Sequence, residues 1–313
     1  RLASKSIEEA LEIAMTKLKG AYSLVIMSPK KIIAARDPQG FRPLCLGTID
    51  GGYVVASETC ALDSIGAKFL RDVEPGEIVI LDVNGLRSNR THCGGKTGLC
   101  VFEYVYTARP DSVIDGVSVH AARLKAGAIG VPDYGLDAAL GYARESGIPY
   151  GIGFIKNRYV GRTFILPTQA ERVEAVHIKL NVLADTVKGK RVIMVDDSIV
   201  RGTTSANIVR MLREAGATEV HMRVSSPPFI NPCYFGTDID DKDKLIACKM
   251  SIEEIGKQIG VDSLGYLSVD GIKRIAEGAH CDFCTGCFTG VYPIEVPEKM
   301  PVDKFCYKIS EEV

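Results

Sequence analysis

The feature that most constrains this chain lies in residues 190–205, where an apolar run ends in two adjacent acids. A short turn with Gly202 and three hydroxyl side chains follows the acids, and a helical pattern begins after the turn. A parallel sheet binds ligands outside the carboxyl ends of its strands, and the N–H groups that begin a helix bind phosphate. We therefore predict a strand, a phosphate-binding turn and a helix within an α/β fold.

Each polar residue of this stretch has a chemical role in the predicted site. Asp196 and Asp197 offer oxygen atoms to ribose hydroxyls and to Mg²⁺, and Gly202 lets the backbone approach a ligand without a Cβ clash. The predicted binding residues are Asp196, Asp197, Ser198, Arg201, Gly202, Thr203, Thr204 and Ser205. A strand–turn–helix with an Asp cap explains one acid and one hydroxyl but not the whole set, and the Gly-Lys-Ser/Thr ending of a Walker loop is absent. The stretch resembles the signature of type I phosphoribosyltransferases, whose donor is phosphoribosyl diphosphate.

The rest of the chain shows two patterns, separated by a polar stretch at residues 87–98 that we interpret as a linker. Before it, an amphipathic helix at residues 6–18 and several short strands indicate an α+β layer. The expected strands are residues 22–27, 31–35, 53–57 and 77–81. After it, helical segments such as Leu136–Ser146 alternate with strands such as Glu219–Val224, which favours a parallel sheet with flanking helices. We place the domains at residues 1–90 and 91–313.

Composition and charge exclude several classes of protein. Of the 313 residues, 46% are hydrophobic and 25% are charged, as in an ordinary globular protein, and the net charge of −1 does not favour nucleic acid or an anionic membrane as a partner. No apolar run is long enough to cross a bilayer. The chain has ten cysteines but neither a secretory signal nor an initiator Met. We therefore expect a cytoplasmic protein whose clustered cysteines bind metal.

Five longer strings make the resemblance more specific. They are similar to segments of glutamine phosphoribosylpyrophosphate amidotransferases, and the likeness extends over essentially the whole chain. The strings are residues 36–44, 55–60, 102–112, 155–165 and 225–228. The resemblance implies the first committed step of purine synthesis, in which one domain hydrolyses glutamine and the ammonia passes to a second domain, where it displaces diphosphate from phosphoribosyl diphosphate to give phosphoribosylamine. It also implies a homo-oligomer and nucleotide feedback inhibitors.

Two further loops belong to the predicted transferase site. Lys156, Arg158 and Arg162 lie in one loop, which suits a lid that closes on diphosphate, although the loop taken alone could be a solvated basic segment. The resemblance gives Tyr159 a part in shaping the ammonia route. Residues 130–135 resemble the diphosphate loop of the family, but Tyr134 stands where the family has a Ser that reaches Mg²⁺ or diphosphate. This departure predicts either an altered diphosphate subsite or missing residues, since the preceding segment also lacks the expected strand.

The cysteines near the carboxyl terminus form two overlapping Cys-x-x-Cys pairs. Such spacing brings thiolates to one metal centre, and by itself it allows either zinc or an iron–sulfur cluster. One subgroup of the resembling family holds a [4Fe–4S] cluster with a structural role, because the reaction needs no redox step. The resemblance assigns the ligands of that cluster to Cys100, Cys233, Cys284 and Cys287.

The glutaminase of this family uses an amino-terminal Cys whose own α-amino group acts as the base, so the nucleophile must be the first residue. Residue 1 here is Arg1. We therefore expect residues 1–90 to be the C-terminal half of an α+β N-terminal-nucleophile glutaminase sandwich, in a chain shortened at its amino terminus and lacking the catalytic Cys. A transferase of this kind would use free ammonia rather than glutamine.

Three other interpretations stay open. Another type I phosphoribosyltransferase, acting on a purine base or orotate, would not need the lid sequence or the four cysteines. A non-catalytic regulator that senses phosphoribosyl diphosphate would resemble purine repressors, which carry a basic DNA-binding domain that this sequence does not show. A non-functional assembly fragment is the third alternative.

Overall fold

Two antiparallel sheets form the amino-terminal half of the computed structural model, which describes residues 6–130, 136–156, 180–237, 239 and 241–296. The first sheet has the order β1-β2-β6-β7 and the second has the order β4-β3-β5. The strands are β1 (Ser23–Ser28), β2 (Lys31–Arg36), β3 (Cys45–Ile49), β4 (Gly52–Ala56), β5 (Lys68–Asp72), β6 (Ile78–Asp82) and β7 (Gly85–Asn89). A short helix, α2 (Thr59–Ser64), connects β4 to β5.

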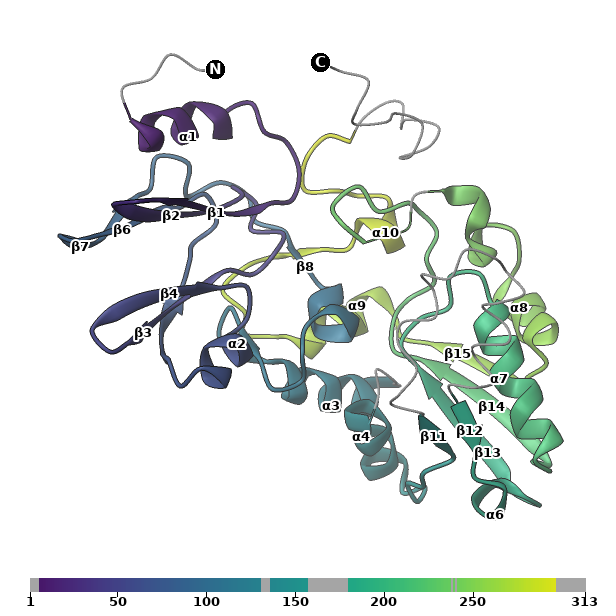
Figure 1. Cartoon of the computed structure of the whole chain (residues 1–313). Coiled ribbons are helices and arrows are strands. Elements are labelled where there is room, and N and C mark those ends of the chain that lie inside the picture. Colours follow the sequence, from purple (N-terminus) through teal and green to yellow (C-terminus); the bar gives the residue numbers. More distant parts are fainter. Residues whose placement is uncertain (1–5, 131–135, 157–179, 238, 240, 297–313) are drawn as a thin grey trace, which may run out of the picture.

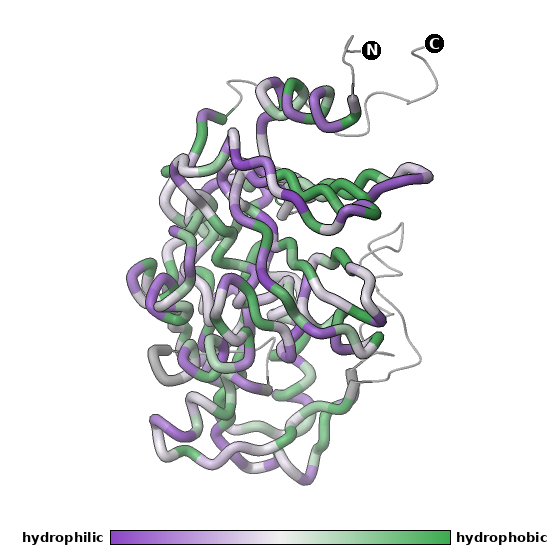
Figure 2. Tube along the Cα trace, turned by 90° about the vertical axis from the view of Figure 1, so that its left-hand side faces the viewer, coloured by the Kyte–Doolittle hydropathy of each residue, from purple (hydrophilic) through white to green (hydrophobic). Residues whose placement is uncertain are grey.

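Helix α1 (Ile7–Met15) lies across one face of the first sheet (Figure 1). The Ser6 side chain accepts a hydrogen bond from the Glu9 N–H at 3.1 Å, which is the N-cap expected from the sequence. The apolar side of α1 buries Leu11 and Met15 against alternate residues of β2 and β6. Figure 2 shows the mixed polar and apolar turns of α1 above strands that are mostly hydrophobic.

The opposite face of the first sheet packs on the second sheet. Successive side chains of a strand point to opposite faces, so Ala34, Val79 and Leu81 turn away from α1 and join a core with Leu44 and Leu46. The α+β layer is therefore present as predicted. The predicted linker is wrong at its start, because residues 87–89 belong to β7, which pairs antiparallel with β6. The polar composition of an edge strand explains the error, since one face and one edge of β7 meet solvent.

A three-stranded parallel sheet organises the second half, at the lower right of Figure 1. Its order is β13-β14-β15, with both strand pairs parallel as the alternating pattern predicted. Helices α7 and α8 pack on it through a core that includes Val209, Leu212, Ile255 and Val220. The elements of this sheet layer are β13 (Arg191–Asp196), α7 (Thr203–Glu214), β14 (Glu219–Val224), α8 (Ile252–Ile259) and β15 (Ser263–Tyr266).

Shorter elements complete the second half. Between the sheets of the first half and β13 lie β8 (Leu99–Cys100), a π-helix η1 (Glu103–Thr107), β9 (Val113–Ile114), β10 (Val117–Ser118), α3 (Val119–Gly130), α4 (Leu136–Ser146), β11 (Phe154–Lys156), β12 (Leu180–Val182) and α6 (Ala184–Val187). Later in the chain lie the 3₁₀ turns η3 (Lys242–Lys244) and η4 (Ile246–Cys248), then α9 (Val269–Ile275), β16 (Phe283–Cys284) and α10 (Gly286–Thr289). None of the helices in the described residues is long and apolar enough to span a membrane.

Helices α3 and α4 touch backbone to backbone. A Cβ atom at Gly127 would collide with the carbonyl oxygen of Ala138, and one at Gly141 would collide with the carbonyl oxygen of Leu124. The two glycines therefore set the distance between the helices. Helix α3 continues to Gly130, so the segment before residues 131–135 is helical and lacks the strand that the family pattern would place there, as expected from the sequence.

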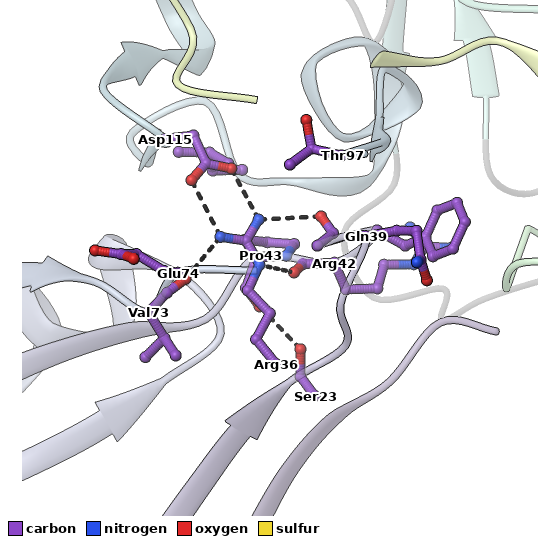
Figure 3. A network of polar contacts seen from close by, with 12 residues as sticks. Ser23, Arg36, Gln39, Arg42, Pro43, Val73, Glu74, Thr97 and Asp115 are labelled. Carbon is purple, nitrogen blue, oxygen red and sulfur yellow. Dashed lines mark hydrogen bonds and ion pairs between the residues drawn. The ribbon is translucent and has the colours of Figure 1, made fainter. Parts of the chain in front are cut away.

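The two halves of the molecule meet at a buried ion pair between Arg36 and Asp115 (Figure 3). Arg36 ends β2 and is fully buried, and Asp115 forms the turn between β9 and β10. The guanidinium donates to both carboxylate oxygens, at 3.1 and 2.8 Å. Its other hydrogen bonds go to the carbonyl oxygens of Gly40, Arg42 and Val73. All five N–H donors of the side chain are thus satisfied.

We expect Gly127→Ala to destabilise the protein by about 1–3 kcal/mol, because the added methyl group must push two helices apart. In an uncrowded helix the same change would stabilise the protein by roughly 1 kcal/mol. The sign of the change in unfolding free energy therefore shows whether the two helices are in contact. Chemical denaturation measures it. Gly95→Ala is the control, because Gly95 is exposed and has nothing within 4 Å of its Cβ position. A Gly127→Ala variant as stable as the wild type would show that the helices are not in contact.

Asp115→Asn should lower the free energy of unfolding by about 3–5 kcal/mol, since it leaves a buried guanidinium without its counter-charge. Asn tolerates the left-handed backbone of this position, where φ is 44°, so strain does not confuse the result. The control is Asp111→Asn, which breaks an exposed pair with Arg109 that is worth only about 0–1 kcal/mol. Adding Arg36→Met to Asp115→Asn should restore part of the lost stability, because it removes the unpaired buried charge. Equal stability of the Asp115 and Asp111 variants would contradict the assignment.

Candidate functional site

The predicted loop begins where β13 ends. Asp196 is the last residue of the strand and lies in one row with Val224 of β14 and Tyr266 of β15. Gly202 adopts the left-handed conformation, with φ of 79°, directly before the first residue of α7. A residue with a side chain would be strained there. The local sequence therefore places two acids and the start of a helix at the carboxyl edge of a parallel sheet, as predicted.

The two acids differ in their surroundings. Asp197 is buried and accepts a hydrogen bond from the Ser198 hydroxyl, whereas Asp196 is only partly buried. Burial raises the pKa of Asp197 to about 6, and the Ser198 hydrogen bond and the Arg123 charge oppose that shift. Arg123 is itself buried, and it donates to the carbonyl oxygens of Tyr104 and Ala108 at 2.8 and 2.7 Å. It thus links the π-helix η1 to the loop, a role that the sequence did not reveal.

A cavity of about 1070 Å³ brings the predicted residues together. The eight residues predicted for the loop all line it: Asp196, Asp197, Ser198, Arg201, Gly202, Thr203, Thr204 and Ser205. The amino-terminal half supplies part of the opposite wall through Tyr22, Ser23, Arg42, Ser57 and Glu58. The π-helix adds Glu103, Tyr106 and Thr107. The cavity is therefore shared between the two halves of the chain.

Polar contacts fix the wall opposite the loop. Arg42 pairs with the buried carboxylate of Glu103, and its Nη2 donates to the carbonyl oxygen of Phe235 at 3.2 Å. The Glu58 carboxylate accepts from the Arg109 N–H at 2.9 Å and from the Ser112 hydroxyl at 2.8 Å. These contacts join segments that are far apart in the sequence. The sequence offered one signal for these wall residues, which is that several of them lie in the segments that resemble the amidotransferase family.

The Tyr22 hydroxyl is a buried polar group of the cavity wall whose hydrogen bonding is incomplete among the described residues. Its oxygen is buried and has no hydrogen-bond partner there. Burial and the charge of Asp37 raise the pKa of Tyr22 to about 12, so the phenol is neutral at physiological pH. A buried neutral hydroxyl at a cavity wall can accept or donate a hydrogen bond to a small ligand.

Most of the residues predicted for the lid and for the second loop lie outside the described part of the chain. Lys156 is the last residue of β11, which pairs antiparallel with β12. Arg158, Tyr159 and Arg162 lie outside the described residues, and so does Tyr134.

The four cysteines that the resemblance singled out gather behind the cavity wall. Parallel pairing of β8 with β16 sets Cys100 directly opposite Cys284. The Cys233 sulfur accepts from the Thr237 N–H at 3.4 Å, and the Cys287 carbonyl accepts from the N–H groups of the segment that leads to Cys233. All four thiols are free and partly buried. Burial, with the charges of nearby thiolates and Glu103, raises the pKa of Cys100 to about 12.

The described residues also contain a second group of side chains that could bind a metal ion. A tetrahedral zinc ion holds sulfur atoms roughly 3.8 Å apart, since each Zn–S bond is about 2.3 Å. Among the described residues, the group whose ligand atoms all lie within 4.8 Å of one another is Asp72, Asp115 and His280. Cys100, Cys233 and Cys284 lie close enough to Cys287 for their charges to raise its pKa.

Comparisons with known proteins agree with this geometry. A glutamine amidotransferase domain model matches residues 2–64. The amidophosphoribosyltransferase of Bacillus subtilis is 49% identical over 308 residues, which cover 93% of this chain and 65% of that protein. The amidophosphoribosyltransferase of Archaeoglobus fulgidus is 48% identical, with 93% of this chain and 67% of that protein covered. This chain thus spans about two thirds of the length of these relatives.

Solved structures show the same likeness in three dimensions. A structure of the allosteric regulatory enzyme of purine biosynthesis superposes with a TM-score of 0.86 at 47% identity, covering 95% of this chain and 68% of that one. The glutamine phosphoribosylpyrophosphate amidotransferase of B. subtilis, in complex with ADP and GMP, gives a TM-score of 0.87 at 46% identity, covering 96% of this chain and 70% of that one.

Proposed function

Because this chain belongs to the amidophosphoribosyltransferase family, we propose that it takes part in making 5-phosphoribosylamine from phosphoribosyl diphosphate and glutamine-derived ammonia, the first step of purine synthesis. The observation that carries the proposal is the shared cavity. It sets all eight residues of the phosphoribosyl loop opposite a wall built by the half that matches a glutamine amidotransferase domain. One half would release ammonia and the other would use it.

The loop supplies what the sugar phosphate needs. The N–H groups and hydroxyls at the start of α7 suit the 5-phosphate, because the helix amino terminus carries partial positive charge. Asp196 and Asp197 would orient the ribose hydroxyls and hold Mg²⁺, which neutralises the diphosphate leaving group when it is bound. The exposed Thr203 and Thr204 hydroxyls can reach a ligand, whereas Ser205 is buried under the loop and would act mainly by fixing it.

The cavity wall suits a small neutral nucleophile. Ammonia must reach the anomeric carbon without being protonated and lost to water, and a cavity lined by both halves of the chain would shorten its path through solvent. The unpartnered Tyr22 hydroxyl and the π-helix residues Tyr106 and Thr107 border that space. In this proposal, Lys156, Arg158, Tyr159 and Arg162 close over the donor, and Tyr134 occupies the altered diphosphate loop.

The family resemblance assigns the four cysteines to a [4Fe–4S] cluster rather than to a single zinc ion. Cys100, Cys233, Cys284 and Cys287 converge from three segments, and the charges of the first three act on Cys287. A cube of four irons binds one thiolate at each corner and keeps the thiolates farther apart than one metal ion does. The cluster would tie β8, β16 and the turn at Cys233 together, so we assign it a structural role.

Other parts of the proposal follow the relatives. We infer that residues 1–90 are part of an N-terminal-nucleophile glutaminase sandwich and that residues 91–313 form the type I phosphoribosyltransferase domain. The B. subtilis structure contains ADP and GMP, so we infer that purine nucleotides act as feedback inhibitors here as well. A homo-oligomer in the cytoplasm, without nucleic-acid or membrane partners, completes the proposal.

Replacing both acids, as Asp196→Asn with Asp197→Asn, should weaken Mg²⁺-dependent binding of phosphoribosyl diphosphate by at least about 100-fold, because two charged hydrogen bonds worth about 1.5–3 kcal/mol each are lost. Isothermal titration calorimetry measures the binding, and product formation with ammonium chloride measures turnover without glutamine. Asp241→Asn, at an exposed acid outside the cavity, is the control. Unchanged binding in the double variant would sink the proposal, and binding without turnover would point to a donor-sensing regulator.

Protein purified without air should contain about four irons per chain and show the broad visible absorption of an iron–sulfur cluster. Cys284→Ser should lose the absorption, because Ser replaces a thiolate ligand. Cys93→Ser is the matched control, since Cys93 is also partly exposed but lies apart from the other four cysteines. Stoichiometric zinc with no iron in freshly isolated protein would overturn the cluster assignment.

A further inference from the structure

A second group of metal-ligand side chains lies at the seam between the two halves, outside the residues that line the cavity. Asp72 ends β5, Asp115 turns the β9–β10 hairpin, and His280 follows α9. One ligand atom from each lies within 4.8 Å of the others. The three side chains therefore come from both halves of the chain and meet at one point.

The backbone and the neighbouring side chains hold this group in place. Asp115 is buried, and Arg36 binds both of its carboxylate oxygens (Figure 3). The His280 N–H donates to the Asp115 carbonyl at 3.1 Å. Gly116 makes room for the imidazole, because a Cβ there would lie 2.9 Å from the His280 Nε2 atom. The aspartate and the imidazole are thus fixed relative to each other before any ligand binds.

The charges of the group do not balance. Two carboxylates lie side by side, and the Arg36 guanidinium neutralises one of them. No hydrogen bond or ion pair joins the Asp72 carboxylate to another side chain within the described ranges, although the charges of Arg36, His280 and Arg71 act on it. Burial and the neighbouring Asp115 charge raise the pKa of Asp72 to about 6. A cation bound within reach of these ligand atoms would pair with the Asp72 carboxylate.

We propose that Asp72, Asp115 and His280 bind a divalent transition-metal ion of the Mn²⁺ or Zn²⁺ class. Two carboxylate oxygens and one imidazole nitrogen are a three-ligand set that such ions accept, whereas Mg²⁺ prefers oxygen alone. His280 is exposed, so water can complete the coordination and the ion has an entry path. Arg36 acts on the ion through Asp115, in the way that hydrogen-bonded partners orient carboxylate ligands.

The proposed ion would stabilise the seam. It would join the end of β5 in the first half to the β9–β10 turn and the segment after α9 in the second half. Because the ligands come together only in the folded protein, binding would raise the melting temperature in a concentration-dependent way. This site does not depend on the proposed transferase function, since it shares no residue with the phosphoribosyl loop or with the four cysteines.

Titration with MnCl₂ followed by electron paramagnetic resonance tests the site. Excess MgCl₂ is present to occupy all-oxygen sites, and Mn²⁺ has little preference for thiolates, so the cysteines do not interfere. We expect one Mn²⁺ to be retained by the wild type and to bind at least about tenfold more weakly in His280→Gln, which loses the only nitrogen ligand. The control is His120→Gln, because His120 is also exposed and lies beside one carboxylate, that of Asp137, at 3.1 Å.

Two further variants separate the site from its neighbours. Asp72→Asn should also lose the retained Mn²⁺, whereas Asp196→Asn should keep it, which would show that the ion is not in the phosphoribosyl loop. Circular dichroism checks that each variant is folded. The proposal is overturned if the wild type retains no Mn²⁺ in excess MgCl₂, or if His280→Gln and His120→Gln bind it equally. Either result would mean that the group does not hold a metal ion.

Discussion

The Arg36 guanidinium is fully buried, and a buried charge is tolerated only when a counter-charge and hydrogen-bond acceptors surround it. Asp115 supplies the counter-charge from the other half of the chain, and three carbonyl oxygens supply the remaining acceptors. The loop that follows Arg36 carries Arg42, which pairs with Glu103 at the cavity wall. The seam thus fixes the position of the amino-terminal wall relative to the phosphoribosyl loop.

The cavity follows from this arrangement. Neither half encloses it alone, because the loop after β13 provides one side and residues near Tyr22 and Glu58 provide the other. The π-helix η1 lies between them, and Arg123 binds the carbonyl oxygens of Tyr104 within it and of Ala108 directly after it. The charge of Arg123 also opposes the rise that burial causes in the pKa of Asp197. A π-helix exposes carbonyl groups that an α-helix would satisfy internally, and such segments often occur at functional sites. Here the irregular helix lets a buried arginine support the carboxyl edge of the sheet.

Local patterns in the sequence predicted the elements that bear the chemistry. Strand β13, the left-handed turn at Gly202 and helix α7 follow from an apolar run, a glycine and a helical period. The errors of prediction are also local. Residues 87–89 form an edge strand, but their polar side chains led to the prediction of a linker. Strands β3 and β5 were missed because short strands with mixed burial lack a clear alternation.

By itself, the sequence indicated which residues could bind a sugar phosphate, because spacing along the chain sets what one turn or one strand end presents, whereas the set of four cysteines came from the family resemblance. Only the tertiary structure decided which distant residues meet. The Arg36–Asp115 pair joins positions 79 residues apart, and the grouping of Asp72 with His280 depends on how two separately formed sheets pack. Such contacts depend on the packing of whole layers and leave no periodic trace in the sequence.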